Sequence, residues 1–409
     1  MQDTNKLPVS NIASSSTSEK LPKTHYEGFL EFSKKAMGLP ILELLQKSIK
    51  DLGDYVPGTL DDRPFQNVGL MIIKSILKAI KMHPDDYVDK LTITDIYNKL
   101  PEILPDFRSY MNLLHHIYLF SRRRMIFRFE EALTAKLLYT DINKVDSEFV
   151  RCPFDSFYIS IPENREMMIR NQHTGIHRVV GIYVSYIEDI EALNARYPDE
   201  EKDEEGWHPD LKFEGKRYNK AIRIFAVADK NENAVHEKDD ATFYMTLFFA
   251  PGDVFPQVDY MVRKYSDKDQ LEKDYQYLWK LFEFTLNAIL YITSPTADFV
   301  RVPAKYDSSK NKDVAAKKNA NLSKIGVIST GSHVYITHEY RMRYRNGTLR
   351  DTPQSVVSTG TPMWVVRGHY RNQAHGPGRT LRMLIWIEPH VKGKGIVEGN
   401  SPGRTYTVT

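Results

Sequence analysis

Residues 361–390, TPMWVVRGHYRNQAHGPGRTLRMLIWIEPH, contain the pattern around which the rest of the chain is organised. Side chains alternate between the two faces of a strand, so residues 363–371 predict a strand with one apolar and one basic face. The apolar face holds Trp364, Val366 and Tyr370, and the basic face holds Arg367, His369 and Arg371. Residues 372–379 follow as a polar loop with a strong turn signal, Gly376-Pro377-Gly378. Because residues 381–387 return as an apolar strand, the stretch predicts a β-hairpin.

Three functions fit such a hairpin: a solvated sheet face, a surface that binds RNA or another anion, and a metal-independent phosphodiesterase site. Arginine forks match phosphate geometry, and aromatic rings stack on bases. The RNA contacts expected here are Arg367, Tyr370, Arg371, Gln373 and Arg379. If the hairpin is a phosphodiesterase site, His369 and His375 are expected to share general acid and base catalysis, because the ordinary pKa of an imidazole lies near neutrality.

The charge of the chain is unevenly distributed. Residues 301–409 hold 18 Lys and Arg against 6 Asp and Glu, a net +12, whereas residues 1–300 carry a net −9. Residues 331–345 predict a second strand with a basic row at alternate positions, formed by Arg341, Arg343 and Arg345. A basic C-terminal part on an acidic remainder favours an anionic partner, either RNA or a ribosome surface. The alternative is a charged face that only keeps the protein soluble.

The first 150 residues predict a helical region. Residues 1–24 contain few apolar side chains and are expected to be a disordered tail. Residues 25–150 repeat apolar side chains every three or four positions, which is typical of amphipathic helices. We expect these helices at residues 41–52, 68–82 and 94–100, and one or two more within residues 107–138.

From residue 151 to 300 the period changes from helical to alternating. Five antiparallel strands are expected, at residues 157–161, 166–170, 177–187, 221–228 and 242–249. They are expected to pack on a buried helix at residues 268–293. The acidic residues 199–205 predict a solvated loop, residues 301–330 a basic linker or loop, and residues 331–409 a basic β module. The fold class is therefore α+β.

Composition excludes several classes of protein. Cys152 is the only cysteine, so the chain forms no internal disulfide and has no zinc-binding thiolate set. The longest charge-free apolar run, residues 284–297, is too short to span a bilayer. Few carboxylates flank the hairpin, where Glu388 stands almost alone, which favours histidine chemistry over a two-metal site. We expect a cytoplasmic protein with no cofactor, no metal and no membrane partner.

The order of these elements resembles one known family. The resemblance rests on the Phe157–Ile161 strand, the helix that ends near Ala297-Asp298, the basic variable loop and the segment Arg367-Gly368-His369-Tyr370 with its glycine turn. Over residues 150–390 the chain is similar to the phage and plasmid anti-CRISPR proteins of the V-A2 type. The resemblance implies an inhibitor that recognises the N-terminal peptide of a type V-A CRISPR effector during translation and causes loss of its mRNA.

Two alternatives to this inhibitor remain open at the level of the sequence. One is a ribonuclease that uses His369 and His375, and the other is a phage or plasmid structural protein.

Overall fold

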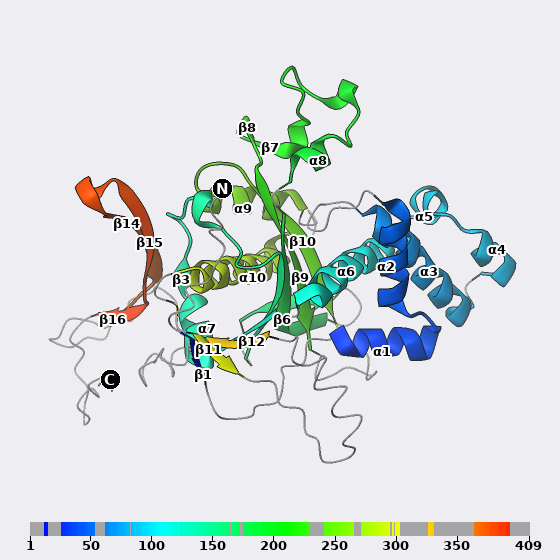
Figure 1. Cartoon of the computed structure of the whole chain (residues 1–409), viewed down its shortest axis with the longest axis horizontal. Coiled ribbons are helices and arrows are strands. Elements are labelled where there is room, and N and C mark those ends of the chain that lie inside the picture. The colour runs from blue at the N-terminus through cyan, green and yellow to red at the C-terminus, as the bar shows by residue number, and fades with distance from the viewer. Residues whose placement is uncertain are drawn as a thin grey trace, which may run out of the picture.

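The computed structural model describes residues 12–14, 26–53, 62–81, 83–123, 125–162, 166–171, 175–187, 189–229, 241–265, 271–294, 297, 299–302, 326–330 and 364–392. The expected α+β class is confirmed. In Figure 1, helices lie at one end, a twisted sheet with a long helix lies in the middle, and a hairpin stands apart at the other end. None of the helices described here is both long and apolar enough to cross a membrane.

Six helices of the described chain lie between β1 (Ile12–Ser14) and β2 (Met125–Phe129), two strands of the central sheet. They are α1 (Tyr26–Met37), α2 (Ile41–Leu52), α3 (Arg63–Ile80), α4 (Asp85–Lys90), α5 (Ile93–Lys99) and α6 (Leu104–Arg123). The helices expected at residues 41–52, 68–82 and 94–100 are thus confirmed as α2, α3 and α5. Thr92 caps α5, because its side chain accepts a hydrogen bond from the backbone N–H of Asp95 while the Asp95 carboxylate accepts one in return.

The central sheet is mixed rather than antiparallel. Its strands run in the order β1-β11-β12-β2-β4-β6-β9-β10, with β5 paired to β6. They are β1 (Ile12–Ser14), β2 (Met125–Phe129), β4 (Ser156–Ser160), β5 (Met168–Asn171), β6 (Gly175–Ile187), β9 (Lys220–Ala228), β10 (Thr242–Phe249), β11 (Phe299–Val302) and β12 (Gly326–Thr330). The five expected strands are confirmed as β4, β5, β6, β9 and β10, and they pair antiparallel. The prediction was wrong for β2, which pairs in parallel with both β12 and β4.

Strand β2 interrupts the segment that was expected to be entirely helical, residues 107–138. There α6 ends at Arg123, β2 follows, and α7 (Glu131–Leu137) leads to the short strand β3 (Thr140–Asp141). Ile126 packs against α6, whereas Phe127 faces the core on the opposite side of the sheet. A strand that is buried on both faces appears in the sequence as a short apolar run. The periodicity of such a run does not distinguish a strand from a buried helix.

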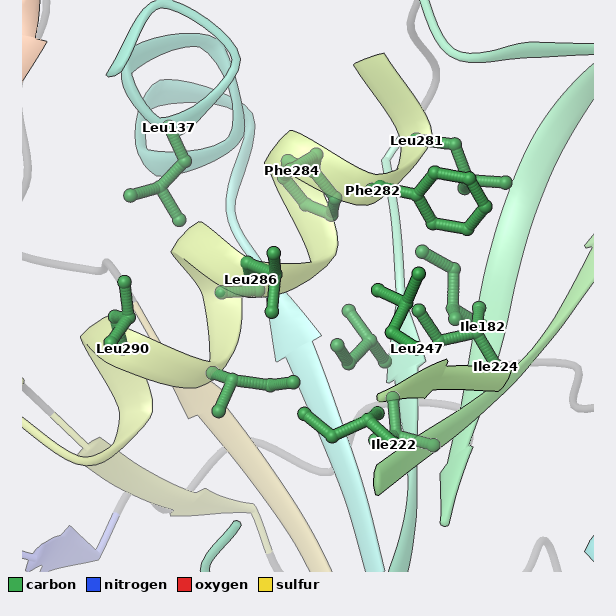
Figure 2. Packing of buried hydrophobic residues seen from close by; sticks show 14 of the residues in the cluster. Leu137, Ile182, Ile222, Ile224, Leu247, Leu281, Phe282, Phe284, Leu286 and Leu290 are labelled. Atoms are coloured by element: carbon green, nitrogen blue, oxygen red, sulfur yellow. The ribbon is translucent and has the colours of Figure 1, made fainter. Parts of the chain in front are cut away.

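The largest core lies between the sheet and α10 (Leu271–Ile292), which confirms the helix expected at residues 268–293. Figure 2 shows Phe282 and Leu281 of α10 beside Ile182 of β6, Ile224 of β9 and Leu247 of β10. The neighbouring helix α9 (Val254–Tyr265) adds buried residues to the same core. Because α10 is buried over most of its surface in its C-terminal half, it is a rigid support for whatever packs on its outer side.

The acidic stretch around residue 200 is part of an ordered lobe and not only a solvated loop. The lobe contains α8 (Glu191–Asn194), the 3₁₀ turns Asp199–Glu201 and Pro209–Leu211, and the strands β7 (Lys212–Phe213) and β8 (Lys216–Arg217). Trp207 and Leu211 are buried in a small core of its own. Lys212 neutralises part of the acidic charge by pairing with Glu205 at 2.8 Å.

Two buried histidines lie where α6 packs on the sheet. His115 and His116 are both fully buried, and the Nδ1 atom of His116 lies 2.8 Å from the hydroxyl of Ser185 on β6. Burial lowers the pKa of both imidazoles well below its usual value, and the nearby Arg223 guanidinium lowers it further. Both side chains are therefore neutral in the folded protein.

We predict that replacing Gly181 of β6 by alanine destabilises the protein. A Cβ atom at this position would lie 1.8 Å from the hydroxyl oxygen and 2.1 Å from the Cζ atom of the buried Tyr158 on β4. Overpacking of this kind costs about 1–3 kcal/mol or more of unfolding free energy, which denaturant titration measures. Combining Gly181→Ala with Tyr158→Leu should cost less than the sum of the two single changes. Strict additivity would show that the two positions do not touch.

We predict that His115 contributes to a loss of stability in acid. Below the unfolded pKa of about 6.5 the unfolded chain binds a proton that the folded chain refuses, so stability falls by about 1.4 kcal/mol per pH unit for each such histidine. Glu283, described below, acts with the opposite sign, so the comparison is made in a Glu283→Gln background. Denaturant titrations from pH 7 to pH 5 should show a shallower loss after His115→Leu. An unchanged slope, matching that of a control His375→Gln variant, would contradict the prediction.

Candidate functional site

The predicted hairpin is present, but its first strand begins and ends later in the sequence than expected. Strand β14 (Gly368–His375) pairs antiparallel with β15 (Leu381–Ile387). The turn lies between them at Pro377–Arg379, entered through Gly376 with a positive φ of 74°. Residues 372–375 therefore continue the strand instead of forming a loop. Residues 364–366 do not join this strand: they form β13 (Trp364–Val366), which pairs with β16 (His390–Lys392). In Figure 1 the hairpin, hereafter the arm (residues 368–387), projects away from the body of the protein.

Arg367 fastens the root of the arm to the long helix. Its Nη2 atom lies 3.3 Å from the Oε1 atom of Glu283 on α10, and its guanidinium lies 5.6 Å from the ring centre of Tyr139. The Arg367 side chain is 37% exposed and that of Glu283 only 9%. The expected RNA contact at Arg367 is therefore already occupied by an internal carboxylate, so its placement supports a positioning role.

Gly368 allows the arm to approach β3 closely. Its backbone N–H donates a 2.9 Å hydrogen bond to the carbonyl oxygen of Tyr139, and it pairs in register with Thr140. A Cβ atom at Gly368 would lie 2.3 Å from the Thr140 hydroxyl oxygen and 2.8 Å from the Cδ atom of Pro389. Only glycine fits between these two neighbours without a shift of the backbone.

Tyr370 points into the core, together with Trp386 on the opposite strand. Tyr370 is 3% exposed, and its hydroxyl donates a 3.1 Å hydrogen bond to the backbone oxygen of Asn287 on α10. Burial raises the pKa of this hydroxyl well above its usual value. The Trp386 indole donates to the Thr140 hydroxyl at 3.2 Å. This burial corrects the interpretation of Tyr370 as an RNA contact, because no ring face is left for a base.

Three carboxylates surround the root of the arm, and of these only Glu388 was expected near the hairpin from the sequence. Burial raises the pKa of Glu283 to about 7; Arg367 lowers it, and Asp141 raises it. Asp141 of β3 lies directly across from His369 in the parallel pairing. Directly after β15, Glu388 forms an ion pair with Lys136 of α7. Glu283 lies 84 residues before Arg367, and Lys136 lies 252 residues before Glu388, so no local pattern in the hairpin predicts either contact.

The carboxylates at the root do not form a metal site. Across the residues that the structure describes, no group of three or more His, Cys, Asp or Glu side chains is placed to hold a metal ion.

His369 and His375 lie on the same face of β14 but far apart. Six residues separate them along one extended strand, which corresponds to about 20 Å at about 3.3 Å per residue. Acid and base groups acting on one phosphate must each come within hydrogen-bond reach of it. The arrangement therefore argues against the predicted pairing of these two imidazoles in one catalytic site.

Several expected RNA contacts are accessible on the arm. Arg371 and Arg379 are exposed, and Gln373 is half-buried beside them, with its Nε2 atom 3.1 Å from the backbone oxygen of Ala374. Arg379 sits at the tip with a positive φ of 56°. The other expected contacts, Arg341, Arg343 and Arg345, lie outside the described residues.

Substituting Arg367 should destabilise the protein in a pH-dependent way. Arg367→Ala removes the cation that favours ionised Glu283, so the pKa of Glu283 rises above 7 and the charged form becomes more costly. Because Arg367 is partly exposed, we expect a loss of about 1 kcal/mol at pH 8 and little loss at pH 5.5, where Glu283 is protonated with or without Arg367. Denaturant titration at both pH values measures the difference. In a Glu283→Gln background the same substitution should cost equal amounts at the two pH values. If the pH dependence persists there, another group is responsible.

Comparison with known proteins finds a similar solved structure and a matching family model. The chain is similar to a solved structure described as the crystal structure of AcrVA2, with 11% sequence identity, coverage of 90% of this chain and 98% of that chain, and a TM-score of 0.47. No curated protein matches the sequence.

The sequence model of the AcrVA2-like family matches residues 127–391. This range runs from the central strand β2 through α10 to the end of the arm. Because it covers more than half of the 409 residues, the chain belongs to the anti-CRISPR type V subtype A2 family.

Proposed function

We propose that this protein blocks production of a type V-A CRISPR effector in the cytoplasm. In this proposal it recognises the N-terminal peptide of the effector as the peptide leaves the ribosome, and it brings about loss of the effector mRNA. The family match over residues 127–391 is the observation that carries the proposal. The match includes both the sheet and the arm, so the inhibitory unit comprises the two together.

The arm supplies the contact with RNA or the ribosome. Between Gly368 and Ile387 the sequence contains three arginines and no Asp or Glu. Arg371, Arg379 and Arg382 are all exposed, and none of them forms an ion pair with another described residue. Such free guanidiniums bind phosphate with two parallel hydrogen bonds. This charge, carried on an arm that projects from the body, favours an extended polyanion as its partner.

The open edge of the sheet is the proposed site for the peptide. Within the described residues, β10 pairs with β9 on one side and with no strand on the other. An extended peptide adds to such an edge through main-chain hydrogen bonds, while side-chain pockets give specificity. Helix α9 already covers one end, because the Phe248 N–H lies 3.0 Å from the Sδ atom of Met261. The peptide therefore adds nearer Thr242, where Phe243 and Tyr244 are half-buried.

Cleavage of the message is assigned to a separate nuclease. The separation of His369 from His375 removes the histidine pair that intrinsic cleavage was expected to need, as argued above. The arm then holds RNA or the ribosome while the sheet holds the peptide, and loss of the message follows from recruitment or stalling.

The proposed function predicts that the encoded peptide, and not the nucleotide sequence, triggers loss of the message. The protein is co-expressed with three effector genes: the natural one, one with synonymous codons in its first segment, and one with that segment shifted out of frame and restored afterwards. Effector mRNA and protein are then measured. We expect loss of the first two messages and survival of the third. Survival of the natural message would overturn the proposal, and loss of all three would exclude peptide recognition.

A further inference from the structure

One face of the arm combines a polar row with an apolar row. Side chains that pair across β14 and β15 point to the same side of the hairpin. The β14 row consists of His369, Arg371, Gln373 and His375, and the β15 row consists of Ile387, Ile385, Met383 and Leu381, in the order of their pairing. We call this face, made of these eight residues, the strip.

The apolar row of the strip does not serve the core. Leu384 and Trp386, which alternate with it on β15, point to the other face and pack into the main cluster. In contrast, the four apolar side chains of the strip belong to none of the hydrophobic clusters formed by the described residues. Leu381 is 52% exposed. Met383, Ile385 and Ile387 are half-buried. A contiguous row of apolar side chains that stays partly exposed and does not serve the core marks a site of interaction.

The positive charge of the arm indicates which kind of partner fits the strip. Arg371 lies within the polar row and Arg379 at its end, whereas the arm contains no carboxylate. Among the described residues that pair with this row, Asp141 is the carboxylate, and it lies opposite His369 at the root. An anionic partner is therefore favoured over most of the length of the strip. A partner that also covers the apolar row must present flat or apolar groups beside its charges.

We propose that the strip binds an unpaired strand of RNA, with phosphates along the β14 row and bases against the β15 row. Residues two apart on a strand are about 6.6 Å from each other, a spacing that suits the consecutive phosphates of an extended strand. In duplex RNA the bases are stacked inside the helix and the deep major groove is too narrow to admit side chains. The strip therefore selects single strands. This inference rests on the proposed contact between the arm and RNA.

The chain itself offers a matched control for the test. Arg382 pairs with Ala374 and lies on the opposite face of the same arm, also exposed. Arg371→Ala and Arg382→Ala therefore remove the same charge from the same hairpin and differ only in the face affected. Ile385→Ser, which changes the neighbour of Arg371 across the strands, tests the apolar row without changing charge.

Binding is measured by fluorescence anisotropy on the full chain, with a labelled 12-nucleotide RNA of mixed sequence and the corresponding 12-base-pair duplex. We expect the single strand to bind about tenfold more tightly than the duplex, and both Arg371→Ala and Ile385→Ser to weaken it about fivefold or more, because phosphate and base contacts are lost separately. Arg382→Ala should weaken it about twofold or less, since it removes only long-range attraction. Thermal unfolding of each variant checks that the arm remains folded.

Three outcomes would overturn the inference. These are equal affinity for single strand and duplex, equal losses for the two arginine variants, and no effect of Ile385→Ser on RNA binding. If Ile385→Ser leaves RNA binding unchanged but abolishes the loss of effector message in cells, the strip docks a protein instead. If the RNA results are as expected but the natural effector message survives, the proposed function fails while the strip stands.

Discussion

The attachment of the arm to helix α10 is the constraint on which the rest of the site depends. Arg367 pairs with Glu283, Tyr370 donates to the backbone of Asn287, and both partners belong to the buried half of that helix. Asn287 in turn donates from its side chain to the backbone oxygens of Leu137 and Thr140, 3.0 and 2.7 Å away. A single helix thus ties the core, β3 and the root of the arm together. An isolated two-stranded hairpin is at best marginally stable in water, so this attachment determines where the arm points and whether it stays formed.

The side chains of the segment Arg367-Gly368-His369-Tyr370 suggest RNA binding, but in the structure most of the segment attaches the arm to the body of the protein. Three of its four residues hold the arm in place. Arg367 forms an ion pair, Gly368 allows a close approach to β3, and Tyr370 has a buried hydroxyl. Of the four residues, only His369 belongs to the strip. The residues that make the family recognisable at this point therefore hold the arm in place, and the residues free to contact a partner lie farther along it, towards Arg379.

Sequence periodicity predicted the elements that have one apolar and one more polar side. Strands β4, β6, β9 and β10 and helix α10 were expected close to their observed bounds, because alternation or a strongly apolar helix marks them. The hairpin was expected too, but its first strand was placed about five residues too early. Strand β2 was missed, since both of its faces are buried and its short apolar run continues the pattern of α6. The carboxylate of Glu283 was missed for another reason: its meeting with Arg367 is a tertiary contact between segments 84 residues apart. Burial likewise decided the role of Tyr370, because a tyrosine suits an RNA surface and a core equally well.

In the proposed function, the strip on the arm contacts the message whose translation is blocked. Ultraviolet crosslinking in cells that express both this protein and the effector tests it most directly, with the crosslinked peptides and RNA both identified by mass and sequence. We expect crosslinks at residues 369–387, on the side of Arg371, to the effector mRNA. Crosslinks confined to other parts of the chain, or to RNAs unrelated to the effector, would contradict it.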